Sequence, residues 1–114
     1  MKAVGYTQNL PSADENSLQD IQLPDPTPGP RDLLVRVEAV SVNPVDTKLR
    51  KKKPSVGGAP VVLGYDAAGI VEAVGPEVIG FKVGDAVYYA GDVTRPGTNS
   101  ELHAVDEQIG RAHV

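Results

Sequence analysis

The sequence predicts a mainly β domain with one short helix, and three observations lead to this fold class. Twelve glycines and ten prolines among 114 residues, with 4% aromatic residues, favour short strands joined by many turns. Residues 32–42 alternate in side-chain character with the two-residue period of a strand. In residues 61–85, apolar pairs alternate with glycines, which suit the bulges, corners and positive φ of a strongly bent sheet; these are Gly64, Gly69, Gly75, Gly80 and Gly84.

The first two strands lie before residue 24. Residues 1–6 predict an opening strand, and the polar residues 7–16 predict a loop. Residues 18–23 predict an edge strand, because the prolines that follow cannot donate sheet hydrogen bonds; these are Pro24, Pro26, Pro28 and Pro30. We interpret this proline series as a connector, with a proline-rich partner motif as the alternative.

The clearest strand pattern covers residues 32–42, where Val35, Val37 and Ala39 share one face. The other face carries Leu34 and charged residues, so we expect a half-buried strand. Three more strands are expected farther along the chain, two in residues 61–85 and one in residues 83–89, with a short last strand in residues 101–105. Asp85 is interpreted as a turn residue.

Local signals at both ends predict a short helix after the clearest strand. Asn43 suits the N-cap and Pro44 the first helical position. The helix should run to about Lys53 and stop at Pro54. Asp46 in the first turn should accept from free backbone amides at the positive end of the helix dipole.

Composition excludes several classes of protein. A chain of 114 residues suits one domain, and its net charge of −4 argues against a nucleic-acid surface. The absence of cysteine excludes disulfides, thiolate catalysis and cysteine-bound metals in this sequence. The first residues lack the apolar stretch of a signal peptide, and no apolar run approaches the roughly 20 residues of a membrane span. We therefore expect a cytoplasmic protein with no membrane partner.

The last six residues, IGRAHV, break the apolar alternation and match the translation of a common sequencing-adapter stretch. We expect a domain over residues 1–108 and a non-native tail over residues 109–114, so that the chain would be a fragment truncated near Gln108. Genomic DNA that encodes these six residues without an adapter would contradict this expectation.

Two blocks of the sequence, residues 35–46 and 61–85, together resemble the medium-chain dehydrogenase/reductase family. The resemblance implies that the chain is the amino-terminal catalytic domain, a GroES-like partly open β-barrel, which packs in this family against a Rossmann domain that binds NAD(P). No G-x-G-x-x-G that follows a strand and opens a helix occurs in this sequence. Most of the cofactor site would therefore belong to the missing Rossmann domain.

The resemblance points to the zinc-free branch of the family. Zinc members carry a cysteine after the long strand and a histidine in Gly-His-Glu, and this chain has Asn43 and Tyr65 at those positions. We therefore expect no catalytic zinc and no structural zinc. The run Asn43-Pro44-Val45-Asp46-Thr47 looks like the quinone oxidoreductase and enoyl reductase branch. His103 and His113 are expected to be surface residues rather than metal ligands.

The resemblance also implies the candidate site residues. Asn43 would face the nicotinamide and substrate cleft, where its amide donates to a carbonyl oxygen as hydride arrives, besides capping the helix. Lys48 replaces a tyrosine of many relatives and would contact a cofactor phosphate or a substrate oxygen, unless it is only a solvated charge. Tyr65 would border the substrate pocket or be a core aromatic residue. Asp66 should fix the local backbone or an arginine of the missing domain, and the loop of residues 91–100, with Arg95, is a connector or a substrate lid.

The implied activity is NADPH-dependent reduction of quinones or α,β-unsaturated carbonyls by hydride transfer, in a full-length oxidoreductase. NADPH rests on the resemblance alone. We expect the fragment by itself to be inactive, and the partners to be a small-molecule substrate and a second copy bound through the missing domain. Two alternatives stay open: a stand-alone GroES-like protein-interaction module, and a zinc-dependent alcohol dehydrogenase. A fragment should expose a contiguous apolar patch, whereas an evolved module should have polar residues there.

Overall fold

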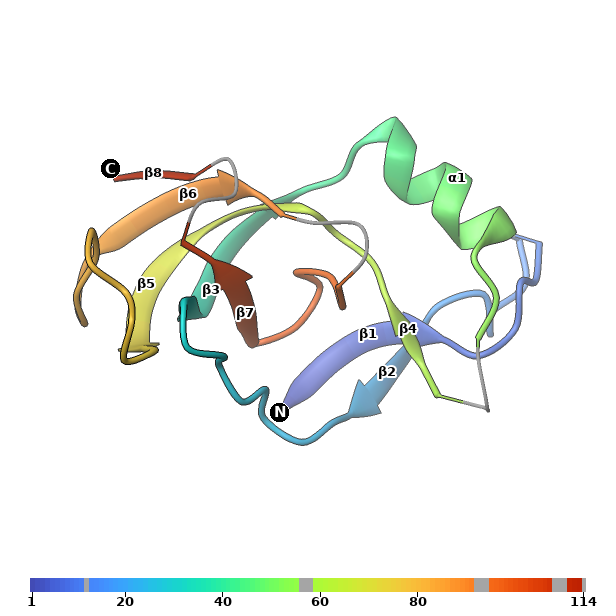
Figure 1. Cartoon of the computed structure of the whole chain (residues 1–114). Coiled ribbons are helices and arrows are strands. Elements are labelled where there is room, and N and C mark those ends of the chain that lie inside the picture. Colours follow the sequence, from blue (N-terminus) through green and yellow to red (C-terminus); the bar gives the residue numbers. More distant parts are fainter. Residues whose placement is uncertain (12, 56–58, 92–94, 108–110, 114) are drawn as a thin grey trace.

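A computed structural model describes residues 1–11, 13–55, 59–91 and 95–107, and the backbone of residues 111–113. These residues form two antiparallel sheets and one helix in an elongated body of 43 × 25 × 20 Å (Figure 1). The sheets stay open and do not close into one barrel, which confirms the predicted mainly β, partly open architecture. The elements are β1 Lys2–Tyr6, β2 Gln19–Gln22, β3 Asp32–Ser41, α1 Pro44–Lys52, β4 Val61–Val62, β5 Asp66–Val74, β6 Ala86–Ala90, β7 Leu102–Asp106 and β8 Arg111–His113.

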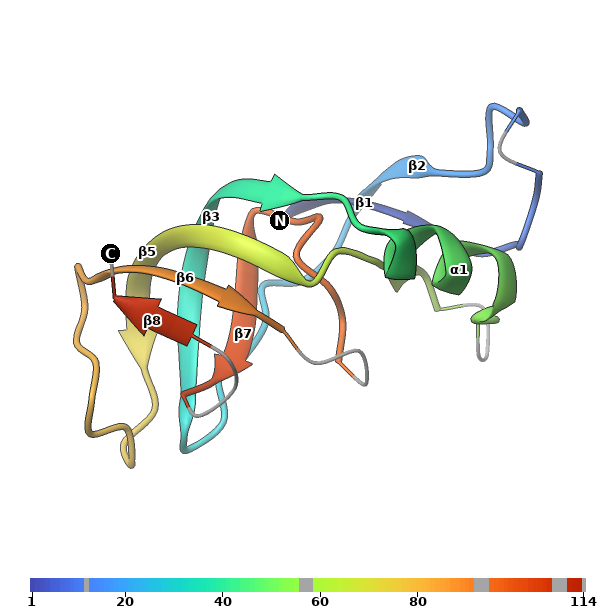
Figure 2. The same cartoon turned by 90° about the horizontal axis from the view of Figure 1, so that it is seen from above.

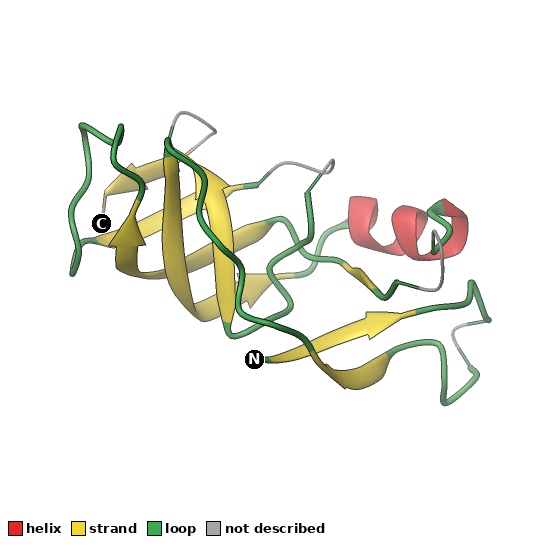
Figure 3. Ribbon diagram, turned by 60° about the horizontal axis from the view of Figure 1, so that its bottom comes forward, coloured by secondary structure: helices red, strands yellow, loops and turns green. Residues whose placement is uncertain are grey.

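The smaller sheet has the strand order β2-β1-β4, so that β2 lies at the edge, as its flanking prolines predict. The larger sheet has the order β7-β3-β5-β6-β8. Figure 3 shows the two sheets side by side, with the helix beyond the end of the larger one. Between them runs the segment of residues 97–101, where Asn99 accepts from the Val4 amide at 2.9 Å and donates its own amide to Leu63 at 3.0 Å.

Irregular pairing between β3 and β5 bends the larger sheet. The register passes from Val37 opposite Gly69 to Ala39 opposite Ala68, so that Glu38 is an extra residue in β3. An added Cβ at Gly69 would lie 2.2 Å from the Arg36 carbonyl oxygen, so only glycine permits this close approach. Ala39 was expected on the buried face but is exposed, because the bulge interrupts the two-residue alternation.

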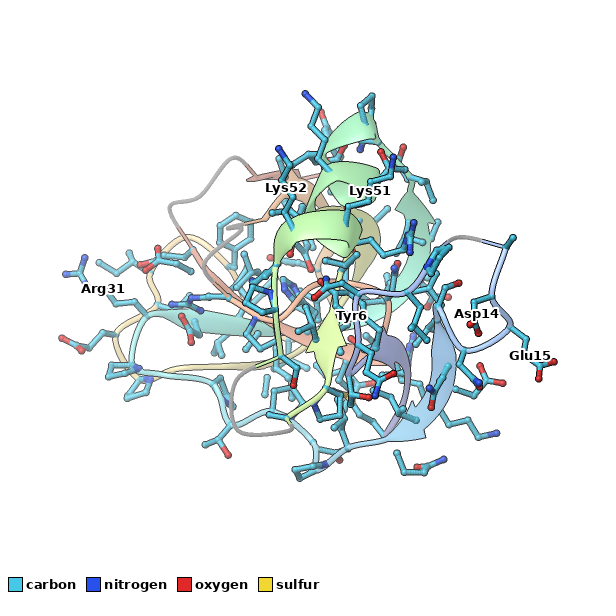
Figure 4. All side chains as sticks on the ribbon, turned by 90° about the vertical axis from the view of Figure 1, so that its right-hand side faces the viewer. Tyr6, Asp14, Glu15, Arg31, Lys51 and Lys52 are labelled. Carbon is cyan, nitrogen blue, oxygen red and sulfur yellow. The ribbon has the colours of Figure 1, made fainter. Side chains whose placement is uncertain are left out.

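Helix α1 begins and ends where the sequence predicts. Asn43 precedes it in extended conformation, and the Lys53 amide closes the last turn by donating to Leu49 at 2.7 Å. The side-chain amide of Asn9 donates to the Arg50 carbonyl at 2.8 Å, and the Tyr6 hydroxyl lies 2.7 Å from the Lys53 carbonyl oxygen. Figure 4 shows Tyr6 beneath the helix, on the side away from the exposed lysines at its end.

Two apolar clusters form the core. The larger lies on the β3–β5–β6–β7 sheet and contains Leu33, Val35, Ala67, Val71, Val87, Tyr89 and Val105. The smaller contains Tyr6, Leu63 and Tyr65, with Leu49 of the helix packed against it. The smaller cluster therefore fixes α1 to the turn that joins β4 to β5. Seen from above, α1 lies at the end of the molecule away from the β5–β6 turn (Figure 2).

Two sequence expectations need correction. The strand expected over residues 83–89 begins at Ala86, because Gly84 has φ +94° and Asp85 closes a turn by accepting from the Lys82 amide at 3.0 Å. Residues 111–113, for which no strand was expected, form β8 and pair with β6. Within the described residues, no helix is long and apolar enough to cross a membrane.

Candidate functional site

Asn43 and Asp66 meet where β3 passes into α1. Ser41 pairs with Asp66 in the sheet, which places Asn43, two residues farther on, beside the start of β5. The side-chain amide of Asn43 donates to Asp66 Oδ2 at 2.7 Å, and both side chains are half-buried. A carboxylate acceptor makes this a strong hydrogen bond and fixes the orientation of the amide. The second N–H of the amide has no acceptor among the described residues.

Asp46 supports Asn43 from the first turn of the helix. Its Oδ2 accepts from the Asn43 backbone amide at 2.8 Å, which is the contact expected of an acidic residue at this position. Asp46 is buried, with 7% of its surface exposed, whereas its neighbours Val45 and Thr47 are exposed. Asp46 therefore faces the interior while its carboxylate holds the residue that opens the helix.

An apolar groove of about 450 Å³ adjoins the Asn43–Asp66 contact. It is lined by the ends of three neighbouring strands, β3, β5 and β6. Among the described residues that line it, Asp66 is the only ionisable one apart from tyrosines. Tyr88 lines the groove with 53% of its surface exposed, and Val40 with 44%. Val42 and Val45, on either side of Asn43, are exposed as well. The described surface around Asn43 is thus largely apolar.

Tyr65 lies in the smaller core cluster, with 4% of its surface exposed. It follows Gly64, whose φ of +98° turns the chain from β4 into β5. The Tyr65 hydroxyl is buried without a hydrogen-bond partner among the described residues. Burial chiefly, and then the Asp46 carboxylate and Tyr6, raise the pKa of this hydroxyl above its usual value. Tyr65 is thus a core residue of the described structure, and a contact of its ring with a substrate pocket stays a prediction.

Lys48 is exposed on α1 and is not brought together with Asn43. It lies two residues after Asp46, or about 200° around the helix, and therefore on the side opposite the buried carboxylate. Among the described residues no group pairs with its ammonium. Arg95, in the loop of residues 91–100, pairs with Asp32 at 3.1 Å. Residues 92–94 of the same loop lie outside the described residues, so the choice between lid and connector stays open.

His103 was expected on the surface, and this expectation is wrong. Only 4% of its surface is exposed, and its ring stacks on Tyr89 with 5.7 Å between centroids. Its Nε2 lies 3.0 Å from the Pro96 carbonyl oxygen, which only accepts, so Nε2 carries the proton and Nδ1 accepts from the Tyr89 hydroxyl at 2.7 Å. Burial is the main cause that lowers the pKa of His103. The side chain of His113 lies outside the described residues.

The described residues contain no group of three or more histidine, cysteine, aspartate or glutamate side chains arranged to hold a metal ion. The side chains at the two positions where zinc relatives have ligands are an amide, engaged with Asp66, and a buried phenol. This donor set does not suit zinc, which prefers thiolate, imidazole and carboxylate ligands.

Sequence reasoning missed Tyr88 and the unpaired oxygen of Asp46. The run Ala86-Val87-Tyr88-Tyr89-Ala90 contains the signal for Tyr88, because a two-residue period that buries Val87 and Tyr89 must expose Tyr88. No signal in the sequence could have revealed the unpaired oxygen of Asp46, since it depends on how α1 packs over the β4–β5 turn.

Comparisons with known proteins give one family and closely similar folds. Residues 29–110 match the alcohol dehydrogenase GroES-like domain family. A zinc-type alcohol dehydrogenase-like protein of Staphylococcus aureus is 45% identical over 109 residues, which are 96% of this chain and 32% of that protein. The chain therefore spans about a third of the length of the curated relatives it matches.

Solved structures agree with this family. A Rhizobium etli protein described as a zinc-dependent alcohol dehydrogenase is 58% identical to this chain, with a TM-score of 0.90. The match covers 94% of this chain and 31% of the Rhizobium etli chain. Escherichia coli quinone oxidoreductase, solved in complex with NADPH, is 25% identical to this chain, with a TM-score of 0.83. The match covers all of this chain and 33% of the Escherichia coli chain. Oxidoreductases of both names thus share this fold.

Proposed function

The chain belongs to the family of alcohol dehydrogenase GroES-like domains, and from this premise we propose that it is the substrate domain of an oxidoreductase that reduces quinones or α,β-unsaturated carbonyls with NADPH. The observation that carries the proposal is the oriented Asn43 amide beside an apolar groove. Planar, weakly polar substrates suit such a groove, because apolar walls bind the ring and one polar group orients a carbonyl. The quinone oxidoreductase fold at 25% identity supports the same reading.

Asn43 is the proposed catalytic residue. Its amide keeps one N–H after the bond to Asp66, and that N–H would donate to the substrate carbonyl as negative charge develops on the oxygen. Asp66 holds the amide in one orientation, so that it needs no rearrangement during the reaction. We assign Asp66 this orienting role and no role in proton transfer.

Bound NADPH would supply the hydride, and most of its contacts would come from the part of the protein that this chain does not contain. Among the described residues, Asn43 is a half-buried hydrogen-bond donor, and we propose that it contacts the bound NADPH. Lys48, exposed on α1, is the second proposed contact, through a cofactor phosphate. Because Tyr65 is buried, we propose that it borders the substrate pocket from within the core and supports Asn43.

A zinc-independent mechanism is part of the proposal. The relatives' names mention zinc, but the amide of Asn43 and the buried phenol of Tyr65 are not usual zinc ligands. A zinc-dependent alcohol dehydrogenase is therefore the weaker alternative, which stoichiometric zinc in the complete protein would revive. A cytoplasmic location and self-association through the missing domain also belong to this proposal.

A stand-alone GroES-like interaction module is the alternative from another class. The exposed side chains of Val40, Val42 and Val45 beside Asn43 argue against it, because an independent domain rarely exposes such a group without a partner. These side chains are expected to be covered in a longer protein.

A chimaera tests the proposed activity. Residues 1–107 of this chain would replace the matching third of the Rhizobium etli relative, which is 58% identical. We expect the chimaera to oxidise NADPH with a 1,4-benzoquinone or an enone, and the isolated chain to show no turnover. In the chimaera, Asn43→Ala should lower kcat/KM at least about tenfold, since one donor to a developing oxyanion contributes this much or more.

Control substitutions in the chimaera test whether the effects are specific to Asn43 and Lys48. Gln8→Ala removes an exposed amide far along the chain from the groove and should leave kcat/KM unchanged. Lys48→Ala should raise KM for NADPH, whereas Lys51→Ala should not. A chimaera that folds but reduces neither substrate class would contradict the proposed function, and turnover by the isolated chain would contradict the expected inactivity.

A further inference from the structure

Two buried oxygen atoms near the Asn43–Asp66 contact lack a hydrogen-bond partner among the described residues. One is Oδ1 of Asp46, and the other is the hydroxyl of Tyr65. Both side chains are more than nine-tenths buried. Folded proteins pair nearly all such atoms with protein groups or with ordered water. The two atoms therefore need a partner.

Packing places the two groups in the same buried region. Asp46 and Leu49 are three residues apart in α1 and so lie on one side of the helix. Leu49 packs against the cluster that contains Tyr65. The Asp46 charge is also near enough to contribute to the raised pKa of the Tyr65 hydroxyl, after burial. The carboxylate and the phenol are therefore both buried in the region between the helix and the β4–β5 turn.

The hydrogen-bonding capacities of the two groups are complementary. An ionised carboxylate oxygen accepts, whereas a phenol both donates and accepts. No direct hydrogen bond joins them in the structure. One water molecule would satisfy both, because it donates to the carboxylate and accepts from the phenol.

We propose that one buried water molecule bridges Asp46 Oδ1 and the Tyr65 hydroxyl, and that Asp46 is thereby the positioning residue of the Asn43 amide. The other carboxylate oxygen of Asp46 accepts from the Asn43 backbone at 2.8 Å. The Asn43 side chain bonds Asp66 at 2.7 Å, and Asp66 follows Tyr65 in the chain. The water thus closes a ring that joins the start of α1 to the start of β5.

The importance of this ring for catalysis rests on the proposed function, but the water bridge does not. Without the bridge, the orientation of the Asn43 amide depends, among the described hydrogen bonds, on its bond to Asp66. With the bridge, the backbone and the side chain of Asn43 are held from two sides.

The water bridge can be tested by measuring whether Tyr65→Phe raises or lowers the unfolding equilibrium constant of the 114-residue chain. If a water joins Tyr65 to Asp46, Tyr65→Phe should raise the unfolding equilibrium constant about five- to twentyfold, as for one lost buried hydrogen bond. If the hydroxyl has no partner, the same substitution should lower that constant. Chemical denaturation measures it.

One further variant calibrates the scale. The Tyr6 hydroxyl contacts helix carbonyls directly, so Tyr6→Phe should raise the unfolding constant. A raised unfolding constant in Tyr65→Phe, as in Tyr6→Phe, supports the bridge, and a lowered one overturns it.

The positioning role needs a readout that stability alone does not move. Tyr65→Phe and Asp46→Asn should both shift the side-chain amide resonances of Asn43 in nitrogen-15 NMR spectra, whereas Thr98→Val should leave them in place. Unmoved resonances in both variants overturn this role. A crystal structure of the unmodified chain should show the water, and a direct Tyr65–Asp46 bond there would overturn it. None of these measurements uses turnover, so an inactive chimaera would refute only the proposed function.

Discussion

His103 couples the stability of this domain to pH through a single buried ring. The ring accepts from Tyr89 and donates to Pro96, an arrangement that only the neutral imidazole satisfies fully. Burial lowers its pKa most; Arg95 lowers it further, whereas the Pro96 carbonyl and Asp32 raise it. Below the ordinary pKa of 6.5, the unfolded chain therefore binds a proton that the folded chain resists.

We expect the free energy of unfolding to level off about one pH unit above 6.5 and to fall as the pH drops through 6.5, by at most about 1.4 kcal/mol per pH unit. Denaturation of the chain at pH 5 to 8 measures this effect. His103→Gln keeps a donor and an acceptor without titrating, so its profile should be flatter over the same range. An equally steep profile in that variant would assign the effect to other groups.

Three glycines in the connections between strands allow the energetic cost of positive φ to be compared with the cost of a steric clash. Gly64 has φ +98°, and an added Cβ would lie 2.6 Å from Asn99 Oδ1. Gly84 has φ +94° with open space around it, and Gly80 has neither constraint, which contradicts the expectation that this position needs glycine. We expect alanine to cost more than about 2 kcal/mol at position 64 and about 1 kcal/mol at 84.

At position 80, alanine should be neutral or stabilise by up to about 1 kcal/mol, because it restricts only the unfolded chain. Urea denaturation of Gly64→Ala, Gly84→Ala and Gly80→Ala measures the series. If Gly64→Ala and Gly84→Ala cost the same, the contacts of Gly64 with the 97–101 segment add nothing to the strain of positive φ.

The elements that the sequence predicts well are those with signals close in the chain. Helix α1 is confirmed almost to the residue, because Asn43, Pro44 and Pro54 act locally. The exposure of Ala39 and the burial of His103 could not be predicted, because the first depends on a bulge at Glu38 and the second on Tyr89 and Pro96. At the candidate site, sequence reasoning named Asn43 and Asp66 but could not place them within hydrogen-bond distance, since that follows from the β3–β5 register.

The distribution of exposed apolar side chains over the whole molecule bears on whether the chain acts alone. Val40, Val42 and Val45 lie around Asn43, where β3 passes into α1. Ile79 and Val83, with 91% and 61% of their surface exposed, lie in the connection between β5 and β6 at the other end of the molecule, away from the candidate site. We expect the cluster of valines beside the candidate site, and not these two side chains, to form the surface that a partner or another domain covers.

We therefore expect the 114-residue chain to self-associate through this cluster at high concentration. Val42→Lys, at a position with 76% of its surface exposed, should shift the chain toward monomer in analytical ultracentrifugation without lowering its free energy of unfolding by more than about 0.5 kcal/mol. Ile79→Lys adds the same charge at the other end of the molecule and should leave self-association unchanged. Equal effects of the two variants would show that net charge, and not the cluster, controls association. A chain that stays monomeric at all concentrations without either substitution would favour an independent module, because its apolar side chains would then need no cover.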